Sequence, residues 1–199
     1  MHIPMIYLDN AATSHPKPEE VYLRVDHILR TIGGNPGRAS HRMALEAARV
    51  IFEAREGLAR LLGVTDSSRL VFTKNATESI NIALKGLVKP GDQIVTTAFE
   101  HNSVARPVRR LENGGAAVTR VTGAEPGLVT AEDIKAALTE ETKLVTVTHA
   151  SNVFGTIQPV AEIGALCKRE GVLFMIDAAQ TAGAMPLDIG KMDVDIVAG

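Results

Sequence analysis

Residues 172–183 read VLFMIDAAQTAG, and this stretch carries the strongest signal for the fold. Its first part, residues 172–176, is uniformly apolar, which fits a strand that is buried on both faces of a parallel sheet. The strand then ends on Asp177, and Gln180 follows three residues later. A buried carboxylate is costly unless a partner compensates its charge. We therefore expect Asp177 to meet a ligand at the end of this strand.

Strand-like and helix-like segments alternate along the rest of the chain. Strands are predicted for residues 70–73, 93–97, 116–121, 143–149, 172–177 and 194–198. Helices are predicted for residues 21–32, 47–61, 77–87, 102–113, 131–138 and 161–170. Alternation at this spacing predicts an α/β fold with a doubly wound, mostly parallel sheet.

Polar residues whose side chains can bind ligands or take part in reactions follow several of these strands directly. The stretches concerned are KNATES (74–79), AFEHNS (98–103), HASNVFGT (149–156) and DAAQ (177–180). In open α/β sheets, ligands bind outside the carboxyl ends of the strands. The sequence therefore predicts one binding site at this edge of the sheet.

The stretch KNATESIN (74–81) opens a helix directly after a predicted strand. The first amides of a helix have no partner within it, so Ala76, Thr77 and Glu78 could bind a phosphate, with the Thr77 hydroxyl as an extra donor. Asn75 and Glu78 also fit a simple capping box that binds nothing. The motif alone favours the capping interpretation.

Three histidines, His41, His101 and His149, stand in loops or after strands, and with Asp177 they raise the possibility of a zinc site. No pair of them has the short spacing of common zinc motifs, so a metal is disfavoured. An imidazole can instead stack on a flat cofactor or transfer protons near neutral pH.

Two further residues have both a structural and a chemical interpretation. Asn152 could simply be a turn residue, or its amide could hold a phenolate oxygen or a carboxylate. Cys167 shares the apolar face of a helix with Ile163 and Leu166, so core packing is the favoured role.

The composition excludes several classes of function. The chain has 199 residues and a formal net charge of −2, which argues against a nucleic-acid or acidic-membrane partner. No apolar run could span a bilayer, and the start of the chain does not resemble a signal peptide. A single cysteine excludes an internal disulfide and fits a reducing compartment, so we expect the cytoplasm. No glycine-rich nucleotide-binding loop is present, which argues against an ordinary nucleotide-binding domain.

Six motifs in order resemble the class V aminotransferases, and most of all their cysteine desulfurase branch. They are LDNAAT (8–13), NPGRASH (35–41), TKNATESIN (73–81), EHNS (100–103), THASNVFGT (148–156) and DAAQTAG (177–183). The resemblance implies an enzyme of fold type I that depends on pyridoxal 5′-phosphate (PLP).

The resemblance also implies roles for the cofactor-binding residues. Asp177 would meet the protonated pyridine nitrogen of PLP, and Gln180 would bond its phenolic oxygen. His101 would stack on the ring as a catalytic residue that is a candidate for moving protons. The amides of Ala76 and Thr77 would hold the phosphate.

The same resemblance implies residues for the substrate. Asn152 would contact both the phenolic oxygen of PLP and the substrate carboxylate, and Ala11 and His41 would lie near the substrate. The implied reaction converts L-cysteine to L-alanine and passes the sulfur on as a persulfide. A homodimer and a sulfur-acceptor protein are implied as partners.

One departure from the family concerns the lysine that forms the Schiff base. In the family it follows the strand that reads VDIVAG (194–199) here, and Lys191 stands on the wrong side of that strand. We expect residues 1–15 to be an N-terminal arm of the small domain at the active-site edge, and residues 16–199 to be the PLP-binding large domain. That domain would lack its final strand, and the chain would lack the C-terminal small domain.

The 199-residue chain alone is therefore expected to bind PLP weakly and to turn over no cysteine. Two alternatives stay open at this point. One is another reaction of the same class, by an aminotransferase or a selenocysteine lyase. The other is a truncated module without catalysis that serves binding or dimerisation.

Overall fold

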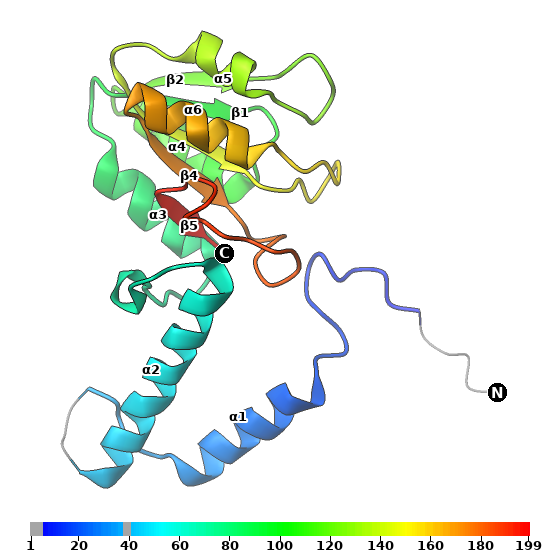
Figure 1. Ribbon diagram of the computed structural model, residues 1–199, viewed down its shortest axis with the longest axis vertical. Coiled ribbons are helices and arrows are strands. Elements are labelled where there is room, and N and C mark those ends of the chain that lie inside the picture. Colours follow the sequence, from blue (N-terminus) through cyan, green and yellow to red (C-terminus); the bar gives the residue numbers. More distant parts are fainter. Residues whose placement is uncertain (1–5, 38–40) are drawn as a thin grey trace. The chain divides into compact units, whose positions relative to one another are not determined.

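The computed structural model describes residues 6–37 and 41–199, and the chain divides into two compact units, Met1–Leu58 and Ala59–Gly199 (Figure 1). Part of the motif NPGRASH and the first five residues of the predicted N-terminal arm lie outside the described residues. The predicted domain boundary between residues 15 and 16 remains a prediction. It separates the arm of the small domain from the PLP-binding domain, whereas the division at Leu58 separates compact units.

The first unit contains α1 (Glu19–Thr31) and most of α2 (Arg42–Leu62), which confirms both predicted helices. The side chain of His41 caps α2, because its Nδ1 accepts a hydrogen bond of 3.3 Å from the N–H of Ala44. No residue of α1 is buried. Both helices carry ion pairs between residues four apart, which support exposed helices modestly.

The second unit is a five-stranded sheet in which every pair of neighbouring strands is parallel, so the predicted α/β class is confirmed. The strand order is β2-β1-β3-β4-β5. The strands are β1 (Gln93–Thr97), β2 (Ala117–Val121), β3 (Thr142–Thr148), β4 (Leu173–Asp177) and β5 (Ile196–Ala198). The helices of this unit are α3 (Ala76–Leu87), α4 (Asn102–Asn113), α5 (Ala131–Ala137) and α6 (Val160–Glu170), with the short 3-10 helix η1 (Ser67–Arg69) before them.

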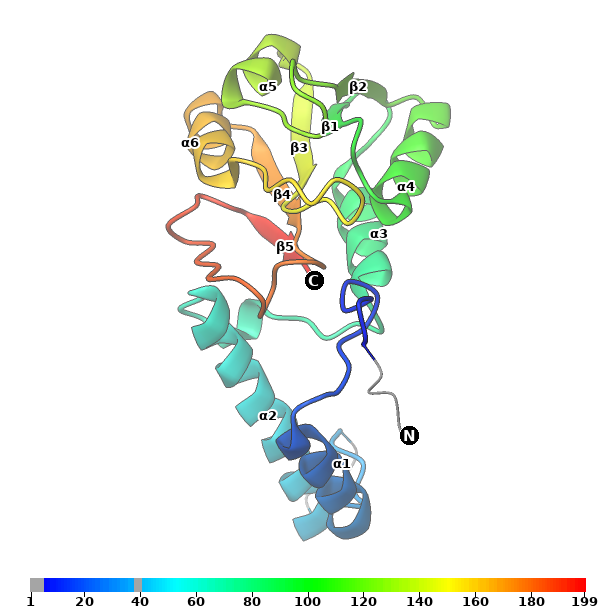
Figure 2. The same cartoon turned by 90° about the vertical axis from the view of Figure 1, so that its right-hand side faces the viewer.

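Helices cover both faces of the sheet, as a doubly wound fold requires (Figure 2). On the face of α5 and α6, one core includes Val95, Val145 and Phe174. On the face of α3 and α4, a second core includes Ile94 and Met175. Alternate strand residues thus enter opposite cores, which is why the strands read as continuous apolar runs.

The predicted strand at residues 70–73 is wrong. This segment runs extended, with Leu70 at φ −89° and ψ 126°, but it is not part of the sheet. Val71 is 77% exposed, so its apolar side chain is not packed in a core. A strand is stable only when a neighbouring strand accepts and donates its backbone hydrogen bonds, and within the described residues the sheet ends at β5.

The topology has a switch point between β1 and β3. From β1 the chain moves outward to β2, and it then crosses back over β1 to form β3 on the other side. The connection after β1 runs through α4 and the connection after β3 runs through α6, and these two helices cover opposite faces of the sheet. Such a switch point is where open α/β sheets bind their ligands.

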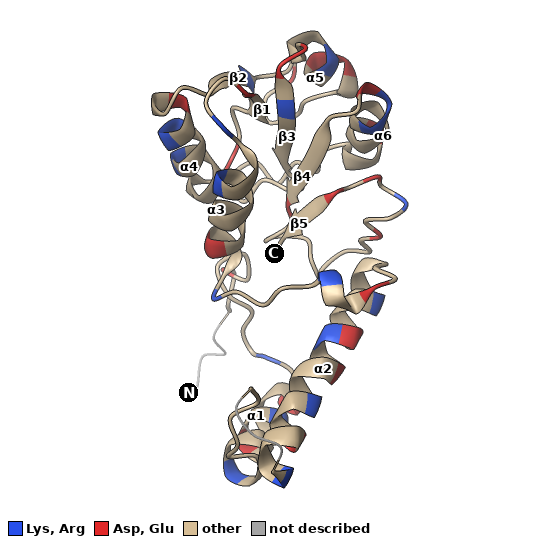
Figure 3. Ribbon diagram, turned by 90° about the vertical axis from the view of Figure 1, so that its left-hand side faces the viewer, with Lys and Arg blue, Asp and Glu red and all other residues tan. Residues whose placement is uncertain are grey.

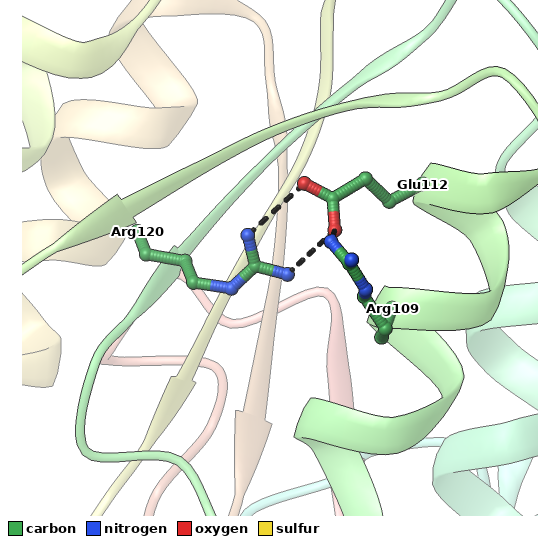
Figure 4. A network of polar contacts seen from close by, with 3 residues as sticks. All are labelled: Arg109, Glu112 and Arg120. Carbon is green, nitrogen blue, oxygen red and sulfur yellow. Dashed lines mark hydrogen bonds and ion pairs between the residues drawn. The ribbon is translucent and has the colours of Figure 1, made fainter.

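An ionic cluster fastens α4 to the edge strand β2 (Figure 4). Glu112 accepts two hydrogen bonds from Arg120 of β2, at 3.1 and 3.0 Å, and one of 2.7 Å from Arg109 of its own helix. These bonds lower the pKa of Glu112 to about 2. Figure 3 shows charged residues mostly on the helices and loops of this unit and few on its strands. Among the described residues, none of the helices has the length and apolarity to cross a membrane.

Candidate active site

Asp177 lies at the carboxyl end of β4 and is only 4% exposed. Its Oδ1 accepts a hydrogen bond of 3.0 Å from the N–H of Ala179. Its Oδ2 lies 3.4 Å from the hydroxyl of Ser103. The neighbouring strand β3 also holds the backbone of Asp177. Thr148 is the register partner of Asp177, and the carbonyl of Asp177 accepts a hydrogen bond of 2.8 Å from the N–H of His149. Asp177 is thus a buried carboxylate that hydrogen bonds hold in one orientation.

His101 caps the N-terminus of α4. Its Nδ1 accepts a hydrogen bond of 3.2 Å from the N–H of Ser103 and lies 2.9 Å from the Ser103 hydroxyl. Because Nδ1 is an acceptor, the proton of the neutral ring belongs on Nε2. The hydroxyl of Ser103 therefore stands between His101 and Asp177. Sequence reasoning did not assign Ser103 to the site, although it is the last residue of the motif EHNS.

The N-terminus of α3 is capped, but the cap uses only part of its donors. Oδ1 of Asn75 accepts the N–H of Glu78 at 2.9 Å, as predicted. Oε2 of Glu78 accepts the N–H of Lys74 at 2.8 Å, and not that of Asn75 as a capping box would have it. In the part of the chain that the structure describes, the N–H groups of Ala76 and Thr77 have no protein acceptor. Both amides are free for a ligand.

The two helix N-termini face one cavity of about 410 Å³. It is lined by Thr77, Asn81, Lys85, His101, Asn102, Ser103, Arg106, Pro107 and Arg110. Three basic side chains and no carboxylate line it, so it favours an anionic group. Ser103 connects this cavity to the buried Asp177. These residues fit a ligand that has an anionic end and a cationic nitrogen, as PLP has.

The remaining predicted site residues lie in other parts of the chain. Gln180 is half-buried in the turn after β4, and Asn152 is exposed in the turn after β3. Ala11 and His41 belong to the first unit, where His41 caps α2. The roles assigned to these four residues remain predictions.

Glu100 was missed by sequence reasoning, although it opens the motif EHNS. Its Oε1 accepts hydrogen bonds from the hydroxyl of Thr97 at 2.7 Å and from the N–H of Thr148 at 2.9 Å. Burial raises the pKa of Glu100 to about 7, and the nearby negative charge of Asp177 adds to the shift. His149 is also buried, which lowers its pKa, and its Nδ1 lies 2.9 Å from the hydroxyl of Thr181.

Two other candidates from the sequence are Cys167 as a nucleophile and a metal site. Cys167 is fully buried in the core under α6, and burial, followed by the charge of Asp195, raises its pKa to about 12. A thiol with such a pKa is not a nucleophile at neutral pH. Within residues 6–37 and 41–199, no group of three or more His, Cys, Asp or Glu side chains could hold a metal ion.

The fold and the site define an α/β protein with a wholly parallel sheet, a buried carboxylate at a strand end and, next to it, a helix N-terminus that lines a basic cavity. The chain belongs to the class V aminotransferase family, because residues 6–199 match the model of that family. The predicted resemblance is therefore confirmed.

The most similar proteins found include cysteine desulfurases. The cysteine desulfurase IscS of Photorhabdus laumondii subsp. laumondii is 37% identical over 99% of this chain and 50% of its own length. The IscS of Vibrio campbellii is 38% identical over the same shares. The chain thus spans about half the length of the curated relatives it matches.

Solved structures give the same result. The apo cysteine desulfurase from Thermococcus onnurineus NA1 superposes with a TM-score of 0.90 and 36% identity, over 96% of this chain and 48% of that one. SspA in complex with cysteine has a TM-score of 0.87 and 32% identity, over 95% and 56%.

Proposed function

We propose that this chain is the PLP-binding portion of a cysteine desulfurase, a protein that converts L-cysteine to L-alanine and passes the sulfur to an acceptor thiol as a persulfide. The observation that carries the proposal is the buried Asp177, joined through Ser103 to a cavity that α3 opens with free amides. The similarity to cysteine desulfurases supports the choice of reaction.

Bound PLP supplies an electron sink for a carbanion at the α-carbon of the substrate. Asp177 would accept a hydrogen bond from the protonated ring nitrogen and keep it protonated, and the amides of Ala76 and Thr77 would bind the phosphate. The ring of His101 would stack on the cofactor, with its proton on Nε2 available for transfer. Because the cavity is basic, it would also attract the phosphate before the ring docks.

Further parts of the proposal concern residues outside this cluster and the surroundings of the protein. Gln180 and Asn152 would bond the phenolic oxygen, and Asn152, Ala11 and His41 would contact the substrate. Residues 1–15 would be an arm of the small domain. The protein would act as a cytoplasmic homodimer that delivers sulfur to an acceptor protein.

The reaction is tested with the protein expressed from its own gene and saturated with PLP. We expect equal amounts of alanine and transferred sulfur from L-cysteine when a thiol acceptor is present. Parallel assays supply an amino acid with an α-keto acid, and selenocysteine, in place of cysteine. A protein that transaminates, or that releases selenium but no sulfur, would contradict the desulfurase assignment and keep the PLP site.

A further inference from the structure

Glu100 stands at the switch point between β1 and β3, where the backbone ladder between the two strands stops. The register of these strands ends at the pair Thr96 and Thr146. One oxygen of Glu100 then accepts both the hydroxyl of Thr97 and the N–H of Thr148. The carboxyl group thus takes the place of the backbone acceptor that β1 would have offered if it had continued.

The same carboxyl group lies between the two parts of the candidate site. Its own chain neighbour is His101, which caps α4 and contacts Ser103. Its donor Thr148 is the register partner of Asp177. Glu100 therefore connects the histidine that would stack on the cofactor with the strand end that presents the carboxylate.

The second oxygen of Glu100 is unusual. Oε2 is buried and has no hydrogen-bond partner within the described residues. A buried anion without a compensating cation is strongly disfavoured, whereas a neutral carboxyl group is tolerated at lower cost. Asp177 at the end of β4 acts on it electrostatically, and two histidines adjoin it in the chain, His101 next to Glu100 itself and His149 next to its donor Thr148. The charge of Asp177 further disfavours a second anion.

We propose that Glu100 is a positioning residue whose protonated carboxyl group clamps the ends of β1 and β3, fixes His101 relative to Asp177, and leaves the negative charge at this edge of the sheet on Asp177. The step from this clamp to cofactor binding rests on the proposed function; the clamp itself does not. A neutral clamp keeps Asp177 as the anion that a cationic ring nitrogen would meet.

The clamp is tested without any cofactor, by following the backbone amide signal of Thr148 by NMR while the pH is varied. This N–H donates to the carboxyl group, so its shift reports the ionisation of Glu100. In the 199-residue chain we expect a transition near pH 7, in line with the raised pKa. Glu100→Gln should abolish the transition. Asp177→Asn should move it to lower pH, and Thr97→Val should move it to higher pH, because that hydroxyl stabilises the ionised form.

A transition of Thr148 near the ordinary glutamate value of 4.5, or one that survives in Glu100→Gln, would overturn the proposal. If Glu100→Gln fails to fold, the opposite shifts expected in Asp177→Asn and Thr97→Val decide the question. Identical midpoints of the Thr148 transition in these two variants would also overturn the proposal.

A second arm measures PLP affinity at pH 6, where the clamp is neutral. Glu100→Ala should bind PLP about tenfold more weakly, as the loss of one net hydrogen bond predicts. Glu100→Gln, which keeps the neutral shape, should recover most of that loss; equal losses in both variants would reject a positioning role. If the parent chain binds no PLP at all, the proposed function is wrong. The titration of the Thr148 amide then still tests the role of Glu100 at the ends of β1 and β3.

Discussion

The hydroxyl of Ser103 lies 3.4 Å from Oδ2 of Asp177, although 74 residues separate the two in the chain. This contact joins the first turn of α4 to the end of β4, across the neighbouring strand β3. It orients a carboxylate that would otherwise be buried with one oxygen poorly bonded. Within residues 6–37 and 41–199 no basic side chain forms an ion pair with Asp177, and this is the basis of the first prediction.

Asp177→Asn should bind PLP about thirtyfold more weakly than the parent, because a hydrogen bond to a charged group contributes about 2 kcal/mol. The fold should persist, since asparagine keeps the shape and an acceptor for Ala179. Affinity is measured by fluorescence titration with PLP. The matched control is Asp195→Asn, whose carboxylate accepts the N–H of Phe174 near the other end of β4. An unchanged affinity in Asp177→Asn would remove the residue from the cofactor site.

The phosphate cradle is tested by Ala76→Pro. Proline is tolerated at the first position of a helix, and Asn75 already has the extended backbone that a residue before proline requires. The change therefore removes one amide donor while α3 stays capped. We expect about thirtyfold weaker binding of PLP and of inorganic phosphate, as the loss of one charge-assisted bond of about 2 kcal/mol predicts.

Two comparisons make that result specific. Pyridoxal, which lacks the phosphate, should bind Ala76→Pro as it binds the parent. Ala131→Pro makes the same change at the first position of α5, which Thr130 caps, and should leave PLP binding unchanged. If Ala76→Pro binds phosphate normally, the anion site lies elsewhere.

How much of this could be read from the sequence depends on the range of the forces involved. Caps are local, so Asn75 was predicted correctly as the cap of α3. Residues 70–73 have the right composition for a strand, but a strand needs a partner, and a partner is not a local property. Asp177 was found because a charge at the end of an apolar run is visible in one dimension.

Ser103 and Glu100 were missed because their roles depend on strand register. The contact of Glu100 with Thr148 exists only because β1 and β3 are neighbours and stop pairing two residues before β3 ends. No spacing along the chain encodes that arrangement. A carboxylate within two residues of a candidate histidine, as in EHNS, was the one signal that could have drawn attention to Glu100.

The raised pKa of Glu100 predicts how stability depends on pH. The folded state holds this proton up to about pH 7, whereas an unfolded glutamate releases it near 4.5. Between these values the folded state binds more protons, so the free energy of unfolding falls as pH rises, by about 3 kcal/mol in total. Glu100→Gln lacks this penalty. Relative to the parent, it should gain urea resistance between pH 5 and pH 8.

Glu141→Gln is the control with the opposite sign. A hydrogen bond from Thr139 lowers the pKa of Glu141, so its stabilisation is present above the unfolded pKa and is lost as the solution becomes more acidic. Its variant should therefore differ most from the parent at pH 8, and in the destabilising direction. The same pH trend in both variants would show that neither carboxyl group is responsible.

Gly164 marks a close approach between α6 and the loop before β5. A Cβ atom added there would overlap with the backbone carbonyl oxygen of Met192. Because that oxygen belongs to the backbone, we expect Gly164→Ala to cost about 2 kcal/mol, measured as a lower urea midpoint. Gly86→Ala is the control: no atom lies within 4 Å of its added Cβ, so the exposed end of α3 should gain about 0.5–1 kcal/mol. Equal effects would contradict the packing of α6 against this loop.

The lysines of the chain predict how it reacts with PLP. A lysine that forms a productive imine is desolvated and has a lowered pKa. Every lysine of this chain is exposed. Lys191 is further disfavoured, because its Nζ lies 2.9 Å from Oδ2 of Asp188 and this contact raises its pKa.

After incubation with PLP and reduction with borohydride, peptide mapping of the 199-residue chain should find low labelling scattered over several lysines. Asp188→Ala, which releases the amine of Lys191, should raise labelling at that position only. Stoichiometric labelling of one lysine in the parent chain would mean that the residue forming the imine lies within these 199 residues.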